Sequence, residues 1–248
     1  MSDCMLDLDA LPPTYAASLR AIRDCPADRP FVVAQLGQSL DGRIALPSGE
    51  SRWINGDAAL DHVHRLRAVV DAVVVGIGTA LADDPMLNVR RVPGRSPARV
   101  VIDPRGRLPV TARLLAGDGA PVAVVTSPGA VTPAVATRIE LARCRAGGAF
   151  DPSAVVAALF ARGWRRILVE GGAQTVSSFI DAGATDRLHV LVAPVLLGSG
   201  KAGLSLAPIG RLAEAPRPLT SVHVLADGDV LFDCDMRSSR REARDAAS

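Results

Sequence analysis

The stretch over residues 165–183 constrains the fold most, because it joins a short apolar run, an acid, two glycines and an amphipathic segment in direct succession. The apolar run 167–169 ends at Glu170, and Gly171 and Gly172 follow at once. The next residues repeat apolar side chains at helical spacing until a further glycine, which is a typical helix stop. This order predicts a buried strand that turns through two glycines into a helix, the unit from which parallel α/β sheets are built.

The same alternation of strand and helix runs along the chain. Residues 57–70 show helical periodicity, and a second helix begins at Pro152 after the N-cap residue Asp151. Residues 222–236 alternate apolar and polar side chains around an Asp-Gly pair, which indicates a β-hairpin. Short apolar segments typical of buried strands occupy residues 31–36, 44–46, 72–75, 98–102, 122–125, 165–170 and 188–192. We therefore predict an α/β fold with a mostly parallel sheet, covered by helices, and an antiparallel hairpin at its edge.

The two ends of the chain differ from this pattern. Residues 1–28 hold at most one short helix, so we expect a loose N-terminal extension. Residues 237–248 form a polar tail of mixed charge. The predicted domain is therefore residues 29–236.

Two predicted turns from a strand into a helix consist largely of glycine, so few side chains cover their backbone. One is Gly171-Gly172, and the other is the segment 76–79, which reads Gly-Ile-Gly-Thr. Glycine lets a ligand approach the backbone closely, and a helix N-terminus favours a phosphate. The alternative is that both turns are ordinary packing joints, and for each turn we give the two readings similar weight. A dinucleotide fingerprint fails at the second turn because Leu81 takes the place of its third glycine. Residues 198–201 resemble the end of a phosphate loop but lack its first glycine and its hydroxyl residue, so we interpret them as a plain loop.

Charged side chains that could take part in chemistry lie on either side of the turn at residues 76–79. Arg67 lies at the edge of the apolar face of the helix 57–70, and Arg90 follows a loop that contains Asp83 and Asp84. Two arginines that converge on one site suit a phosphate or a carboxylate. The alternatives stay open at this point: arginine is most often a solvated surface residue, and an Asp-Asp-Pro segment is more often a turn than an acid catalyst.

Composition excludes several classes of protein. The net charge is +2, Lys201 is the single lysine, and aromatic residues make up 3% of the chain, which argues against a nucleic-acid binder. The four cysteines show no C-x-x-C spacing, so we expect no metal site. No apolar run approaches the roughly 20 residues that a membrane helix needs. The N-terminus lacks the features of a signal peptide, and we expect a cytoplasmic protein without a membrane contact.

Seven motifs in register carry a resemblance to a known family. Together they resemble the reductase domain of the bifunctional riboflavin-biosynthesis deaminase/reductase over residues 31–235. The motifs are Ser39-Leu40-Asp41-Gly42-Arg43-Ile44-Ala45, Gly49-Glu50-Ser51-Arg52-Trp53-Ile54, Gly76-x-Gly78-Thr79, Leu81-Ala82-Asp83-Asp84-Pro85-x-Leu87-x-Val89-Arg90, Val100-Val101-Ile102-Asp103, Val169-Glu170-Gly171-Gly172 and Ala193-Pro194-x-Leu196-Leu197-Gly198.

The resemblance implies a three-layer fold like that of dihydrofolate reductase, with a cis peptide bond between the paired glycines. It also implies NADPH as the cofactor and a pyrimidine ribose phosphate as the substrate, with Glu170 and Asp83 as the catalytic acids. The implied substrate contacts are Ser51, Arg67, Leu87, Arg90 and Glu170. The cofactor contacts, with the two glycine turns included, are Gly37, Trp53, Gly76, Gly78, Thr79, Asp83, Gly171, Gly172, Ala173, Gln174, Thr175, Val176, Ser177 and Ser178.

The implied reaction is the transfer of a hydride to C1′ of a phosphoribosylamino-pyrimidine, which gives its ribitylamino form. The chain has no zinc-deaminase signature, and it has Gln35 where many bacterial members carry a lysine. The substrate is therefore either the deaminated uracil or the diamino pyrimidine, and a related pterin-like pathway is a more distant alternative. A non-catalytic NADPH-binding module is the alternative from another class. The hairpin edge and the resemblance together suggest a homodimer.

Overall fold

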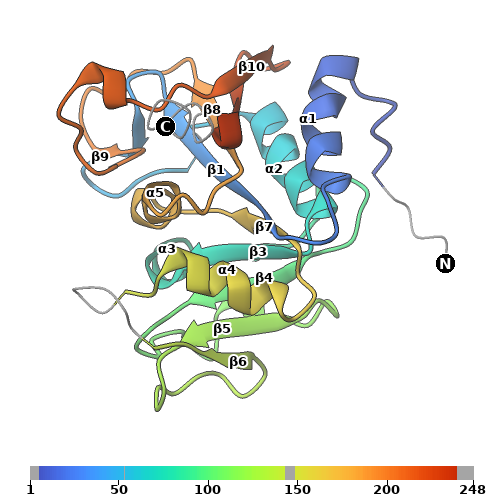
Figure 1. Cartoon of the computed structure of the whole chain (residues 1–248), viewed down its shortest axis with the longest axis vertical. Helices are drawn as coiled ribbons and strands as arrows, with labels where there is room; N and C mark the ends of the chain where they lie inside the picture. The colour runs from blue at the N-terminus through green and yellow to red at the C-terminus, as the bar shows by residue number, and fades with distance from the viewer. Residues whose placement is uncertain (1–5, 53, 143–148, 239–248) are drawn as a thin grey trace, which may run out of the picture.

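The computed structural model describes residues 6–52, 54–142 and 149–238. Within these ranges the main sheet has nine strands in the order β10-β11-β8-β1-β7-β3-β4-β5-β6 (Figure 1). Its strands are β1 (Phe31–Ser39), β3 (Ala72–Gly76), β4 (Ala98–Ile102), β5 (Val122–Thr126), β6 (Thr137–Glu140), β7 (Arg166–Val169), β8 (Arg187–Ala193), β10 (Leu219–Val224) and β11 (Val230–Asp235).

The sheet is parallel from β8 through β6 and antiparallel at the hairpin edge. Strand β1 lies parallel to β7 and to β8, and β3 lies parallel to β7 and to β4. Strands β10 and β11 pair antiparallel with each other, and β11 pairs antiparallel with β8. The predicted mostly parallel sheet with a C-terminal antiparallel hairpin is confirmed. Because β1, β3 and β7 run in one direction, their carboxyl ends meet at one edge, where open α/β sheets bind ligands.

Helices cover both faces of the sheet and give it three layers. Helices α1 (Pro13–Arg23), α2 (Asp57–Val69) and α3 (Ile77–Asp83) share one apolar core with the sheet. Helices α4 (Pro152–Phe160) and α5 (Ala173–Asp181) share a second core on the other face. Central strand residues alternate between the two cores: Val73 and Val75 face the first, while Val74 faces the second.

The prediction of a loose N-terminal extension is wrong for helix α1. Tyr15, Leu19 and Ile22 lie at helical spacing on one face, and the last two have no exposed surface. The Tyr15 hydroxyl also lies 2.7 Å from Nδ1 of His62, whose Nε2 is 3.0 Å from Nδ1 of His189. An apolar helix face and a buried polar contact therefore join this segment to the domain.

The structure contains two strands that the sequence analysis did not predict. Strand β6 extends the sheet beyond β5 in parallel register. Strand β9 (Lys201–Ala202) pairs antiparallel with β2 (Arg43–Ala45) in a separate two-stranded sheet. The remaining elements are two short 3₁₀ turns, η1 (Arg113–Leu115) and η2 (Leu212–Glu214). None of the helices in the described ranges is long and apolar enough to cross a membrane.

Candidate active site

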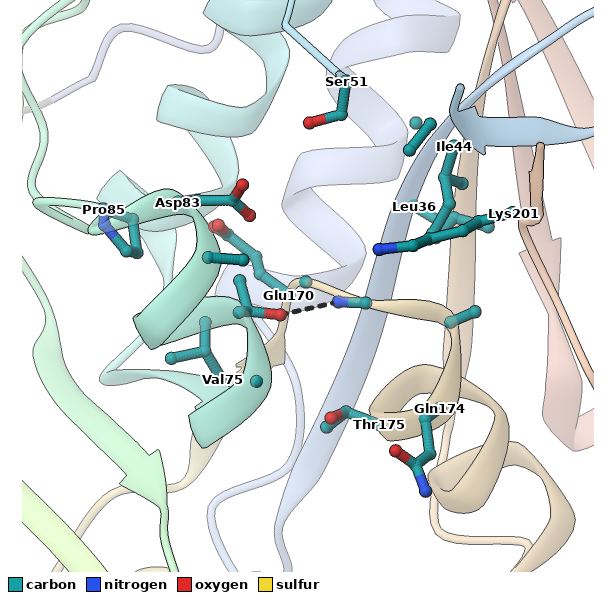
Figure 2. Close-up of a pocket in the computed structure, with 18 of the residues that line it drawn as sticks. Leu36, Ile44, Ser51, Val75, Asp83, Pro85, Glu170, Gln174, Thr175 and Lys201 are labelled. Carbon is teal, nitrogen blue, oxygen red and sulfur yellow. Dashed lines mark hydrogen bonds between the residues drawn. The ribbon is translucent and has the colours of Figure 1, made fainter. Parts of the chain in front are cut away.

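A cavity of about 810 Å³ opens at the carboxyl ends of β3 and β7, within the usual size range of ligand pockets. Figure 2 shows its arrangement: Asp83 and Glu170 point into it from one side, Lys201 from the other, and Ser51 from the top of the view. Many of the site residues that the sequence analysis predicted therefore line one space. They are Gly37, Ser51, Arg67, Gly78, Thr79, Asp83, Leu87, Glu170, Gly171, Gly172, Ala173, Gln174 and Thr175.

The two glycine turns interlock through their threonines. A side chain at Gly76 would collide with Oγ1 of Thr175, and one at Gly171 would come within 2.7 Å of Oγ1 of Thr79. The N–H of Gly172 donates to that same Oγ1 of Thr79 at 2.9 Å (Figure 2). Gly76 therefore serves packing, because it is absent from the cavity lining, whereas Gly171 and Gly172 serve packing and also line the cavity.

The paired glycines adopt a different turn from the implied one. The described chain contains no cis peptide bond, so the expectation of a cis Gly171–Gly172 bond is wrong. Gly171 instead makes the turn at φ +112°, a backbone conformation that side chains other than glycine rarely adopt. The cavity edge is thus formed by a backbone that only glycine allows.

Helix α5 presents part of its N-terminus to the cavity. Thr175 and Val176 donate their N–H groups to the carbonyl of Gly172, whereas those of Ala173 and Gln174 have no protein acceptor within the described residues. Two backbone donors therefore remain for a ligand. The cofactor contacts predicted at positions 176–178 do not line the cavity. Val176 and Ser177 are buried, and the hydroxyl of Ser178 donates to the backbone carbonyl of Thr175.

Glu170 and Arg67 form a buried two-pronged ion pair. Nε of Arg67 donates to one carboxylate oxygen of Glu170 at 2.8 Å and Nη2 donates to the other at 2.6 Å. Nη1 donates to the carbonyl of Asn88 at 3.2 Å. The side chains are 10% and 8% exposed, so the pair is shielded from bulk water although both members line the cavity. Arg67 thus fixes the orientation of Glu170.

A second cavity of about 470 Å³ shares a wall with the first and gathers arginines. Arg52, Arg90 and Arg113 line it, and the shared wall consists of Ser51, Arg67, Asp83, Pro85 and Leu87. Burial lowers the pKa of Arg90, and the neighbouring guanidinium groups of Arg67 and Arg113 lower it further. Such a concentration of like charge favours an anionic ligand, above all a phosphate.

The loop that ends α3 is held in an unusual backbone conformation beside both cavities. Asp84 has φ +40° and Leu87 has φ +55°, and both are sparsely populated conformations for residues with a side chain. Asp84 accepts the N–H of Arg113 at 2.8 Å, and Leu87 is 2% exposed. Packing and hydrogen bonding thus maintain a strained loop, which is a frequent property of binding sites.

His64 fixes the start of the segment that carries Arg90. Its Nδ1 accepts the backbone N–H of Arg90 at 3.1 Å. Burial lowers the pKa of His64 to about 3, and Arg67 and Arg90 add to this effect. His64 is therefore neutral at physiological pH and keeps its acceptor available.

Residues 30–231 match the family described as the RibD C-terminal domain. The chain belongs to this family.

Relatives of known name agree with this membership. The chain is 38% identical over 175 residues to the 2,5-diamino-6-ribosylamino-4(3H)-pyrimidinone 5′-phosphate reductase of Methanothermobacter thermautotrophicus, over 68% of this chain and 80% of that protein. It is 32% identical over 184 residues to the riboflavin biosynthesis protein RibD of Aquifex aeolicus, and this match covers 74% of this chain and 51% of that protein. The structure of a Thermotoga maritima deaminase/reductase superposes with a TM-score of 0.72 at 30% identity, and the superposition covers 84% of this chain and 56% of that protein. The chain thus spans about half the length of these two bacterial relatives.

Some residues of this RibD C-terminal domain escape sequence reasoning. Trp53 lies outside the described residues, so its predicted cofactor contact stays a prediction. Lys201 lines the large cavity although the sequence analysis assigned it to a plain loop. Arg113 reaches the smaller cavity from a 3₁₀ turn that no motif marks. Gln35, noted as a departure from the family pattern, also lines the large cavity.

Proposed function

We propose that this protein is an NADPH-dependent reductase that converts 5-amino-6-(5-phosphoribosylamino)uracil to its ribitylamino form in riboflavin biosynthesis. One observation carries the proposal: two cavities share a wall that contains Asp83, and Glu170 lines the larger one. The larger has a free helix N-terminus and glycine-rich walls, while the smaller is rich in arginine. Membership of the RibD C-terminal domain family and the reductases among the relatives support the same reaction.

The residues of the larger cavity fit a dinucleotide. The N–H groups of Ala173 and Gln174 would hold its pyrophosphate, and Gly78, beside which no atom lies within 4 Å of an added Cβ, leaves room for its body. Gly37 and Thr79 complete the walls. When bound, NADPH supplies a hydride to C1′ of the substrate.

The smaller cavity suits the phosphate of the substrate. In this proposal Arg90, with Arg52 and Arg113, binds the phosphate, while Ser51 and Leu87 position the sugar on the shared wall. The phosphate contact expected for Arg67 stays a prediction, since three of its nitrogens already donate to Glu170 and Asn88.

The two acids take different roles. A proton must reach the nitrogen bonded to C1′ as the hydride arrives, so that the C–N double bond of the opened sugar becomes a single bond. Asp83 is exposed, lies on the shared wall and has no side-chain partner within the described residues, so we assign the proton transfer to it. Glu170, held by Arg67, accepts hydrogen bonds from the amino groups of the pyrimidine.

A second substrate has a specific observation in its favour. The diamino pyrimidine, which still carries its ring amino group, is the substrate named for the Methanothermobacter relative at 38% identity and for an Archaeoglobus fulgidus relative at 37%. Purified protein should therefore receive both pyrimidine phosphates with NADPH, while absorbance at the nicotinamide band is followed. Faster NADPH consumption with one compound identifies the substrate. A protein that shifts NADPH fluorescence but consumes none with either compound is a binding module, and the proposal is wrong.

We also propose a cytoplasmic homodimer that forms along the hairpin edge. β10 is the edge strand of the sheet, and its Leu219, Val222 and Val224 are 71%, 54% and 74% exposed. An open edge with apolar side chains is a pairing surface. Sedimentation at micromolar concentration tests this, because a single species at the monomer mass of 25.8 kDa contradicts it.

A further inference from the structure

Lys201 is the only lysine of the chain, and it lines the larger cavity. It lies on β9 opposite Ala45 of β2, so the two side chains share a face, and Ala45 also lines the cavity. The small alanine leaves room beside the longer side chain. Figure 2 shows the Lys201 amine directed into the cavity, facing the side from which Asp83 and Glu170 point inward.

The backbone around β9 fixes this position. Gly200, at φ +132°, packs against the carbonyl of Ala45 so closely that a side chain there would collide with it. A side chain at Gly203 would likewise collide with Gln38. The glycine directly before Lys201 thus lets the strand approach β2 this closely.

A carboxylate anchors the loop before β9 to the turn between β1 and β2. Asp41 accepts the hydroxyl of Ser39 at 2.6 Å and the N–H groups of Leu197 and Gly198 at 3.1 and 2.7 Å. The Ser39 bond, followed by the backbone bonds, lowers the pKa of Asp41 to about 2. Hydrogen bonds to Asp41 therefore join the segment around Asp41 to the segment around Gly198, and this contact fixes the position of the strand that carries Lys201.

Only half of the charged side chains that line the larger cavity are paired with each other. Arg67 and Glu170 neutralise each other in their ion pair. The other charged lining residues are Asp83 and Lys201, and neither has a hydrogen-bond or ion-pair partner within the described residues. Lys201 is thus the uncompensated cation of a cavity that also exposes the backbone donors of Ala173 and Gln174. Ammonium and backbone N–H groups together make an anion site.

We propose that Lys201 binds a phosphate group of the ligand that occupies the larger cavity. This inference rests on the proposed function for its ligands, which offer two sources of phosphate: the dinucleotide and the sugar phosphate. The arginines of the smaller cavity already suit the sugar phosphate, so the pyrophosphate of NADPH is the main expectation.

Two substitutions separate charge from shape. Lys201→Met keeps the chain length and removes the charge, whereas Lys201→Arg keeps the charge. Arg162→Met is the matched control, because Arg162 is exposed in the turn before β7, at the opposite end of that strand from the cavity, and its loss changes net charge equally. Loss of one charge-assisted hydrogen bond should weaken binding roughly 10- to 100-fold in the methionine variant, with most affinity retained in the arginine variant and all of it in the control.

The readouts identify the source of the phosphate. Fluorescence titration gives the Kd of NADPH, and steady-state kinetics give the KM of the substrate. A weaker Kd for NADPH with an unchanged KM assigns the phosphate to the cofactor, and the reverse assigns it to the substrate. If Lys201→Met changes neither value, the proposal is overturned.

Selective labelling gives a test that needs no turnover. Pyridoxal phosphate followed by borohydride reduction modifies amines, and peptide mass spectrometry separates Lys201 from the terminal amine. We expect inorganic pyrophosphate and NADPH to protect Lys201 in the wild-type protein. Labelling that neither compound reduces contradicts the proposal. Protection by pyrophosphate in a protein that consumes no NADPH keeps the anion site and rejects the reductase function instead.

Discussion

Replacing Arg67 with methionine should leave the Glu170 carboxylate buried without the two hydrogen bonds that compensate its charge. Because the two side chains are only 10% and 8% exposed, the pair belongs to the buried class. Removing one member of such a pair lowers the free energy of unfolding by about 3–5 kcal/mol. For a chain of this size that corresponds to a fall in Tm of roughly 6–20 °C.

The double variant distinguishes pairing from general damage. Glu170→Gln replaces the charge with an amide of similar shape, so adding it to Arg67→Met removes the stranded carboxylate. We expect a coupling energy of about 2–3 kcal/mol in a double-mutant cycle measured by urea unfolding. Arg91 and Asp61 form the comparison pair, since both side chains are 32% exposed. That surface pair should give at most about 1 kcal/mol. Additive effects at Arg67 and Glu170 would show that the two side chains do not stabilise each other.

The same variants separate two roles for Arg67. The family resemblance predicts that removing Arg67 mainly raises the substrate KM, as a phosphate contact would. The ion pair predicts instead that kcat falls as well, because Glu170 loses its orientation. Glu170→Gln replaces the carboxylate that accepts hydrogen bonds from the pyrimidine amino groups with an amide, so it should lower kcat roughly 10- to 100-fold with the NADPH Kd unchanged. An Arg67 variant that changes KM alone contradicts the positioning role.

Two further predictions follow from the same contacts. Gly76→Ala should destabilise the protein by about 1–3 kcal/mol because its methyl group meets Thr175, whereas Gly78→Ala, which meets no atom, should be neutral or stabilising by up to about 1 kcal/mol; equal urea midpoints would contradict this. The pKa of His64 falls from 6.5 to about 3 on folding, so its neutral form stabilises the protein fully above pH 6.5 and progressively less as the pH falls towards 3. His64→Asn keeps an acceptor for Arg90 but does not titrate, so between about pH 7 and 5 it should lose about 2 kcal/mol less unfolding free energy than the wild type; equal losses would refute it.

The sequence predicts those parts of the molecule that local patterns determine. The alternation of apolar strands and helices predicts the sheet, because each pattern needs only its own residues to be recognised. The glycines of the turns at Gly76 and Gly171 predict that the backbone of each turn lies close to another group. In the structure Gly76 contacts Thr175 and Gly171 contacts Thr79, and the pattern of a single turn does not reveal this pairing.

The parts that escaped prediction depend on contacts between distant segments. Lys201 lies on a two-residue strand, too short to show periodicity, and it is placed by pairing with β2 and by the hydrogen bonds of Asp41. Arg113 reaches its cavity because its backbone donates to Asp84, 29 residues earlier. The pairing of Arg67 with Glu170 joins residues 103 positions apart. Such contacts follow from the fold rather than from spacing.

Transfer of deuterium from the cofactor to the substrate distinguishes a reductase from a protein that only binds NADPH. The protein is incubated with each pyrimidine phosphate and NADPH in which both hydrogens at C4 of the nicotinamide are replaced by deuterium, and the product is analysed by mass spectrometry and NMR. A reductase of this kind forms a ribitylamino product with one deuterium, located at C1′, from at least one of the two substrates. A product without deuterium at C1′, or no product from either substrate while NADPH binds normally, contradicts the proposed function.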